Sequence, residues 1–171
     1  KYAKAFKAIY LEYTDFVESF GIDEAWLDVT NGRRHSGNAF LIADEIRRRV
    51  KDEIGLTISV GISFNKVFAK LGSDLKKPDA ITEIPYENFQ SILYKLPVES
   101  LLYVGRSTKN KLNKMTIKTI GDLANTSESY LKKYFSSVFV NQGYLNSYVS
   151  SRLQYNKSNI GDIGYNVYIQ D

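Results

Sequence analysis

The segment SFGIDEAWLDVT, residues 19 to 30, decides how the first part of this chain folds. Asp23 and Glu24 lie side by side in it, among apolar residues that favour strands. Carboxylates in such a setting lose water and repel each other unless a cation or hydrogen bonds compensate. A divalent metal would neutralise both, because Mg²⁺ prefers carboxylate oxygens together with substrate phosphates. The alternative is a solvated Asp-Glu turn, since neighbouring strand residues point to opposite faces.

The apolar spacing around this segment predicts an α+β layer, with helices against a sheet. We expect helices over residues 2–14, 36–53 and 65–75, and strands over residues 16–22, 25–29, 56–63 and 80–84. Ser36 is the expected cap of the second helix. Asp28 is expected to end its strand, because turn residues follow it. Gly61, inside a strand, indicates a close backbone approach or a bulge.

The character of the sequence changes near Leu96-Pro97. Strand patterns give way to short helical segments, which places a domain boundary at residues 95–97. The net charge of +4 lies entirely beyond it: residues 1–96 hold 14 basic and 14 acidic residues, and residues 97–171 hold 9 and 5. Such a surplus favours a polyanionic partner. For residues 141–171 the pattern is weak, and no secondary structure is predicted there.

Composition excludes several classes of site. The chain has no cysteine, which excludes disulfides and thiolate metal sites. Its one histidine, His35, lies in the polar run GRRHSGN and argues against a zinc site or a Ser-His hydrolase. No stretch is long and apolar enough for a membrane span, and no secretory signal opens the chain. Because the chain starts in helical pattern without Met, we expect a fragment of a larger protein, and the absence of cysteine is compatible with a cytosolic one.

A basic turn stands out in the second part, in VGRSTKNKLNKMTIKTIGDLA, residues 104 to 124. Gly105 permits a tight turn. Ser107, Thr108 and Lys109 then open a helix whose free N–H groups can hold a phosphate. This pattern is typical of a helix-hairpin-helix that holds the DNA backbone without reading bases. Ordinary paired helices with a glycine turn are the alternative.

Three segments together resemble the Y-family, or translesion, DNA polymerases, and most closely the bacterial polymerase IV and V branch. SFGIDEAWLDVT resembles the family's palm signature, and ISVGISFNKVFAKLGSDLKKPDAI, residues 58 to 81, its second one. Residues 105–124 resemble its thumb helix-hairpin-helix. The resemblance covers most of residues 1–140. It implies an α+β palm over residues 1–96, with a ferredoxin-like sheet incomplete at its N-terminus, and a small all-α thumb with a helix-hairpin-helix over residues 97–171.

The resemblance also implies the roles of single residues. Asp23 would ligate the catalytic Mg²⁺ ions. Glu24 would lie beside the primer 3′ end and could also ligate metal, and Lys77 would reach the triphosphate of the incoming nucleotide. The DNA phosphates would be contacted by Gly105, Arg106, Ser107, Thr108 and Lys109. Ser63, Asn65 and Lys66 fall in a loop that would also approach DNA, whereas an exposed basic helix face is the alternative for Lys66 and Lys70.

The implied parent protein is a DNA-directed DNA polymerase of the lesion-bypass type, which adds deoxynucleotides to a primer 3′ end with two Mg²⁺ ions. Its partners would be primer–template DNA and deoxynucleoside triphosphates, without a membrane. A sliding clamp, contacted through regions outside this chain, is a further partner that the resemblance suggests. The expected location is the bacterial cytoplasm, at the nucleoid.

The chain departs from the family's pattern. The family's metal-binding Asp near its amino terminus, its fingers and its little finger are not found in these residues. We therefore expect the fragment to be inactive alone and to bind metal weakly or not at all. Ser107 and Thr116 stand where the family often has Gly.

Two other functions remain open at this point. A diguanylate-type nucleotide cyclase also has an Asp-Glu pair on a palm-like hairpin, but it would need Gly-Gly before the acids, where this chain has Gly21-Ile22. The second alternative is a non-catalytic DNA-binding module, which would account only for the basic turn.

Overall fold

The computed structural model describes residues 2–135 and 166–170. They divide into two compact units: the first contains the residues up to Glu87 together with a C-terminal strand, and the second begins at Asn88. These units differ from the expected ranges 1–96 and 97–171. The division falls earlier because helix α4 (Phe89–Leu93) packs against α6 (Ile120–Ala124) of the second unit.

The first unit contains the helices and strands that the apolar spacing predicts. They are α1 (Tyr2–Leu11), β1 (Val17–Phe20), β2 (Glu24–Asp28), α2 (Ala39–Arg49), β3 (Ser59–Ser63), α3 (Lys66–Leu75) and β4 (Ile81–Ile84). A π-helical turn over Val50–Ile54 continues α2. The turn after β2 forms as expected, since Asp28 Oδ1 accepts hydrogen bonds from the Thr30 backbone N–H and hydroxyl, at 3.0 and 2.6 Å.

The start of α2 differs from the prediction. Ser36 does not cap the helix, because it lies in a 3₁₀ turn (His35–Gly37) with φ 52°. Asn38 caps it instead, and its Oδ1 accepts from the Leu41 backbone N–H at 3.0 Å. Both residue types are good caps, and the extended backbone of Asn38 decides between them.

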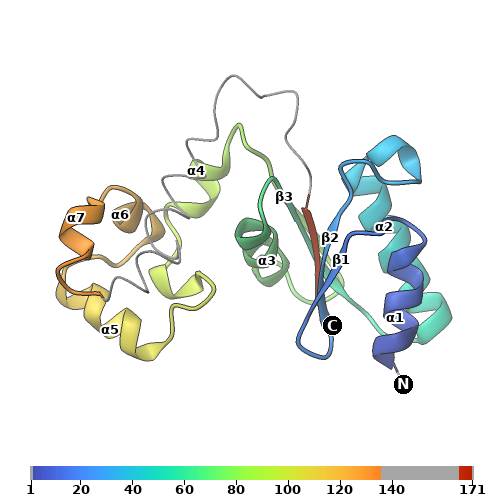
Figure 1. Cartoon of the computed structure of the whole chain (residues 1–171), viewed down its shortest axis with the longest axis horizontal. Helices are drawn as coiled ribbons and strands as arrows, with labels where there is room; N and C mark the ends of the chain where they lie inside the picture. Colours follow the sequence, from blue (N-terminus) through green and yellow to red (C-terminus); the bar gives the residue numbers. More distant parts are fainter. Residues whose placement is uncertain (1, 136–165, 171) are drawn as a thin grey trace. The chain divides into compact units, whose positions relative to one another are not determined.

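Five strands form one mixed sheet in the order β1-β2-β5-β3-β4. Only the pair β3–β4 is parallel. The central strand β5 (Asn166–Gln170), red in Figure 1, comes from the C-terminal segment for which no secondary structure was predicted. The α+β class is confirmed. Up to β4 the order is α–β–β–α–β–α–β, which matches a β–α–β–β–α–β arrangement without its first strand and adds α3 and β4 after it.

Helices cover both faces of this sheet, with α1 and α2 on one side and α3 on the other (Figure 1). The core under α1 and α2 is large and apolar, and its biggest fully buried side chains are Tyr13, Leu27, Ile42, Ile46, Ile58 and Ile62. On the opposite face α3 lies almost against the backbone of β3. A Cβ on Gly61 would stand 1.8 Å from the Ala69 carbonyl oxygen. The close approach predicted at Gly61 is therefore confirmed.

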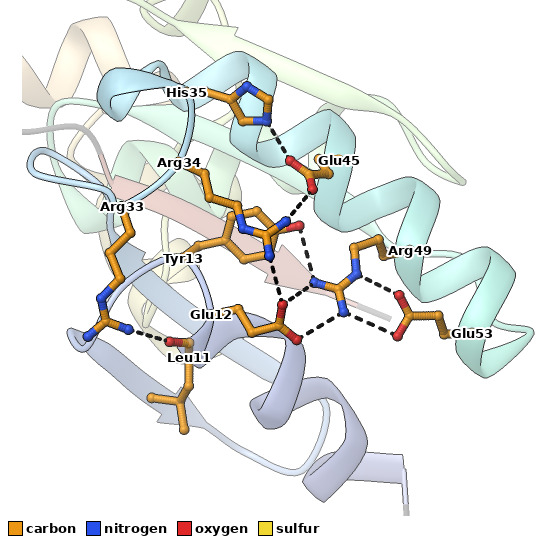
Figure 2. A network of polar contacts seen from close by, with 9 residues as sticks. All are labelled: Leu11, Glu12, Tyr13, Arg33, Arg34, His35, Glu45, Arg49 and Glu53. Carbon is orange, nitrogen blue, oxygen red and sulfur yellow. Dashed lines mark hydrogen bonds and ion pairs between the residues drawn. The ribbon is translucent and has the colours of Figure 1, made fainter.

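A charged network joins the loop before α2 to α2 itself (Figure 2). Glu45 Oε1 accepts from Arg34 at 2.7 Å, and His35 Nε2 lies 2.5 Å from Glu45 Oε2. The hydrogen bond with His35 lowers the pKa of the Glu45 carboxyl. His35 thus takes part in a surface ion-pair network.

The second unit is helical in its described part. It contains α4, a 3₁₀ turn (Val98–Ser100), α5 (Arg106–Lys114), α6 and α7 (Glu128–Leu131). Buried Leu93, Leu112 and Ile120 belong to its interior. Among the described residues no helix is long and apolar enough to cross a membrane.

Candidate active site

The two acids of the opening segment come together at the turn between β1 and β2. Asp23 lies in the turn and Glu24 begins β2. Gly21 starts the turn with φ 73°, a left-handed conformation that glycine adopts without strain. Asp23 Oδ1 and Glu24 Oε2 each lie 4.0 Å from the point where a Cβ on Gly21 would stand. The turn thus places an oxygen of each carboxylate near Gly21, whereas in a straight strand the two side chains would point to opposite faces.

The second oxygen of Glu24 is paired with a lysine of α3. Lys70 Nζ lies 3.2 Å from Glu24 Oε1 and 3.0 Å from Asp74 Oδ2, one turn further along the helix. The Lys70 and Glu24 side chains are only 12% and 16% exposed. An exposed basic face, which was the alternative for Lys70, therefore does not describe it. Lys70 thus supplies a compensating cation to Glu24 from within the chain, whereas Asp23 is exposed to solvent.

Lys77 is connected to the same group. Its Nζ lies 2.9 Å from Asp74 Oδ1, so Asp74 holds Lys70 with one oxygen and Lys77 with the other. Lys77 follows the end of α3 and stays 39% exposed. One contiguous set of charges therefore links Glu24 to Lys77 within a single unit.

An open depression of about 360 Å³ lies beside the acids, between α1 and the β1–β2 hairpin. Asp23 and Glu24 line it together with Lys4, Lys7 and Tyr10 of α1. Sequence reasoning did not assign Lys4 or Lys7 to the site. Their helical spacing, on the side of α1 away from buried Ile9, was the available signal.

The acids fit a magnesium ion in their chemistry. Two hard carboxylate oxygens, Asp23 Oδ1 and Glu24 Oε2, lie near Gly21, and the other Glu24 oxygen is the one paired with Lys70. Mg²⁺ takes one or two carboxylates together with substrate phosphates. Within residues 2–135 and 166–170 no group of three or more His, Asp or Glu side chains could hold a metal ion. Asp23 and Glu24 would thus be the chain's own ligands in this part.

Of the three residues expected in a loop here, only Asn65 lies between β3 and α3, since Ser63 ends β3 and Lys66 begins α3, and all three have internal partners. Ser63 Oγ donates to the Ile84 carbonyl at 2.8 Å, and Asn65 Oδ1 caps α3 by accepting from the Phe68 N–H at 2.8 Å. Lys66 pairs with Glu18, and its Nζ lies 5.6 Å from the centre of the Trp26 ring. These contacts give Ser63 and Asn65 structural roles, and their approach to DNA stays a prediction.

The residues expected to contact DNA phosphates in the thumb lie at the start of α5 in the second unit. Gly105 is the residue before the helix, and Arg106, Ser107, Thr108 and Lys109 form its first turn. Gly105, Arg106 and Ser107 are exposed, whereas Lys109 Nζ is 2.5 Å from Glu99 Oε1.

One residue on each side of α5 has a positive φ, a conformation that glycine adopts most easily. Tyr103 has φ 67° and Thr116 has φ 61°, in the left-handed region that favours glycine. Thr116 is one of the two positions where glycine was expected from the resemblance. Ser107 is the other of these two positions, and its φ is not positive.

Comparison with known proteins places the chain among DNA polymerases. The family model described as the impB/mucB/samB family matches residues 1–74. The chain is 57% identical over 131 residues to a DNA polymerase IV of Acetivibrio thermocellus, which covers 77% of this chain and 33% of the relative. It is 48% identical over 120 residues to a DNA polymerase IV of Clostridium perfringens, covering 70% and 33%. The chain thus spans about a third of the length of these curated relatives.

Solved structures share the fold. The insertion ternary complex of Dbh DNA polymerase matches with a TM-score of 0.77 at 23% identity, covering 89% of this chain and 44% of that one. DinB from Sulfolobus solfataricus matches with a TM-score of 0.74 at 24% identity, covering 90% and 43%. None of these matches favours a nucleotide cyclase. The acid pair, the family match and these relatives agree: the chain belongs to the Y-family of DNA polymerases.

Proposed function

We propose that the protein containing this chain is a template-directed DNA polymerase of the lesion-bypass type. The convergence of Asp23 Oδ1 and Glu24 Oε2 at Gly21 is the observation that carries the proposal. Lys77, linked to Glu24 through Asp74 and Lys70, supports it, because a transferase of nucleotides needs a cation for the triphosphate. In this proposal the first unit is the polymerase palm, and the second is the thumb.

In the reaction the primer 3′-hydroxyl attacks the α-phosphate of a deoxynucleoside triphosphate, and pyrophosphate leaves as the bond to the bridging oxygen breaks. Asp23 and Glu24 would hold the magnesium, and Glu24 would lie beside the primer end. Bound Mg²⁺ supplies stabilisation of negative charge on the attacking and leaving oxygens. Lys77 holds the triphosphate as a point charge.

The second unit supplies DNA contacts in this proposal. The start of α5, from Gly105 to Lys109, holds phosphates by its amide groups and basic side chains, as one half of a helix-hairpin-helix with α6. Such contacts position DNA without reading its sequence. The partners are primer–template DNA, deoxynucleoside triphosphates and a sliding clamp contacted by other parts of the protein, at the nucleoid in the cytoplasm.

The test is primer extension with a chimera. The segment of the Acetivibrio thermocellus relative that matches this chain is replaced by the corresponding residues of this chain. We expect incorporation, and a loss of kcat on the order of 10³-fold or more in Asp23→Asn. Lys51→Gln is the control, because Lys51 pairs with Asp79, which Arg47 also holds. An inactive chimera that still folds would contradict the proposal.

The chain alone gives the second half of the test. Two converging carboxylates are fewer ligands than a pair of metal ions needs in the family's reaction, so we expect no incorporation by residues 1–171 alone. Robust extension of a primer by the chain alone would overturn this expectation.

A further inference from the structure

We propose that Lys70 is an internal counter-ion of the acid pair, which occupies Glu24 until a divalent cation binds and so sets the affinity of the pair for metal. The inference rests on the proposed function of Asp23 and Glu24 as metal ligands. It adds to the site a residue to which the resemblance assigned no role.

The geometry divides the Glu24 carboxylate between two neighbours. Oε1 faces Lys70 Nζ at 3.2 Å, and Oε2 faces the Gly21 side, where Asp23 Oδ1 also lies. Both Glu24 and Lys70 are mostly buried, and burying such a carboxylate without a cation would be costly. Lys70 therefore supplies the positive charge that the acids require when no metal is present.

The same charge opposes a metal ion. A divalent cation between Asp23 and Glu24 would share the Glu24 carboxylate with the Lys70 ammonium, and the two cations would repel each other. Lys70 and the metal thus compete for one carboxylate.

Asp74 gives Lys70 a second partner, which makes the exchange possible. Its Oδ2 lies 3.0 Å from Lys70 Nζ, so Lys70 keeps an ion pair when metal takes Glu24. The other Asp74 oxygen holds Lys77 at 2.9 Å. Of the two acids Glu24 and Asp74, Asp74→Asn leaves Lys70 with the charge of Glu24. Lys70 would then hold Glu24 more firmly.

The two residues therefore predict opposite effects on metal affinity. Removing the Lys70 charge in Lys70→Gln takes away the competitor and should tighten Mn²⁺ binding on the order of tenfold. Asp74→Asn should weaken Mn²⁺ binding. Lys70→Arg, which keeps the charge, should bind like the unchanged chain.

The experiment is titration of the chain with Mn²⁺, followed by the electron paramagnetic resonance signal of the free ion. Lys51→Gln is the matched control, because it removes the same charge from an exposed lysine paired elsewhere in the first unit. The gain in Lys70→Gln should vanish when Asp23→Asn is added, which locates it at the acid pair. Thermal melting shows which variants fold, and Asp74→Asn carries the test if Lys70→Gln does not fold.

Equal or weaker Mn²⁺ binding by folded Lys70→Gln would overturn the inference, and so would an equal gain in Lys51→Gln. Tighter binding by Asp74→Asn would overturn it as well. Primer extension by the chimera separates this result from the proposed function. If the chimera is active but Lys70→Gln does not bind Mn²⁺ more tightly, only the counter-ion role of Lys70 is contradicted. If the chimera is inactive but Lys70→Gln does bind Mn²⁺ more tightly, only the proposed polymerase function is contradicted.

Discussion

Arg49 forms a two-point ion pair with Glu12, which joins α2 to the end of α1 (Figure 2). Arg49 Nη1 donates to Glu12 Oε2 at 2.9 Å, and Nη2 donates to Oε1 at 3.0 Å. The planar guanidinium fits a carboxylate in this bidentate manner, which a lysine would not reproduce. Arg49 Nε also donates to Glu53 Oε1 at 2.5 Å. The pair therefore holds the two helices together above the core.

This network predicts loss of stability in acid. The hydrogen bond from Arg49 lowers the pKa of Glu12 from its ordinary 4.5, and the hydrogen bond with His35 does the same for Glu45. Groups with a lowered folded-state pKa stabilise the fold above their unfolded value and lose that contribution as pH falls through the folded value. We expect the Tm of the chain to fall below about pH 4.5, and part of that fall to be absent in Glu12→Gln. Identical pH profiles for the two proteins would contradict this.

The contact between β3 and α3 predicts a severe effect of a single methyl group. In Gly61→Ala the new Cβ would stand 1.8 Å from the Ala69 carbonyl and 2.5 Å from the Ser73 amide nitrogen, both backbone atoms that cannot move independently of α3. We expect a loss of about 3 kcal/mol in the free energy of unfolding. Urea denaturation measures it. Gly105→Ala is the control for stability, since its Cβ would meet nothing within 4 Å, and a comparable loss there would argue against the steric cause.

The connection after α5 predicts a stabilising change. Thr116 has φ 61°, which a β-branched residue adopts only with strain. Thr116→Gly should raise the free energy of unfolding of the second unit by about 1 kcal/mol. Asn113→Gly, within α5, should lower it by a few tenths of a kcal/mol or more, because glycine is a poor helix former. Equal losses in both variants, measured by thermal unfolding, would show that the strain at Thr116 is of no consequence.

Local pattern was sufficient for most of the first unit. Periodicity located the helices and strands up to β4, and an isolated glycine in an apolar strand pointed to the close packing at Gly61. The cap of α2 was placed two residues early, because Ser36 and Asn38 have the same capping chemistry and only the backbone separates them.

The features that the sequence pattern did not reveal, strand β5 and the partner of Lys70, depend on tertiary contacts. Strand β5 is short, and its place between β2 and β3 follows from the sheet that receives it. Ile169 of β5 is fully buried there. Lys70 looked like one more helix-surface lysine, because its partner Glu24 is distant in the sequence and lies on another element. Asp23 and Glu24 stood out in the sequence, because two adjacent carboxylates in an apolar segment are costly, and their role as metal ligands stays a prediction.

The pairing of Lys109 with Glu99 predicts how the second unit binds DNA. The hydrogen bond from Lys109 lowers the pKa of Glu99, so Glu99 is ionised at neutral pH and competes with phosphate for this lysine. Glu99→Gln should therefore tighten binding of primer–template DNA at low salt, by a few-fold. Lys109→Gln should weaken it and reduce the slope of log affinity against log salt by about 1.

Fluorescence anisotropy with labelled DNA, at several salt concentrations, measures both effects. Glu128→Gln is the matched control, because it removes the same charge from a glutamate of α7, which pairs with Lys132 at 2.6 Å. A net-charge effect would tighten DNA binding equally in both glutamate variants, since their charge change is identical. Release of Lys109 would act in Glu99→Gln alone, and adding Lys109→Gln to that variant would remove the gain. An equal gain in Glu128→Gln would therefore contradict a specific role of the Glu99–Lys109 pair.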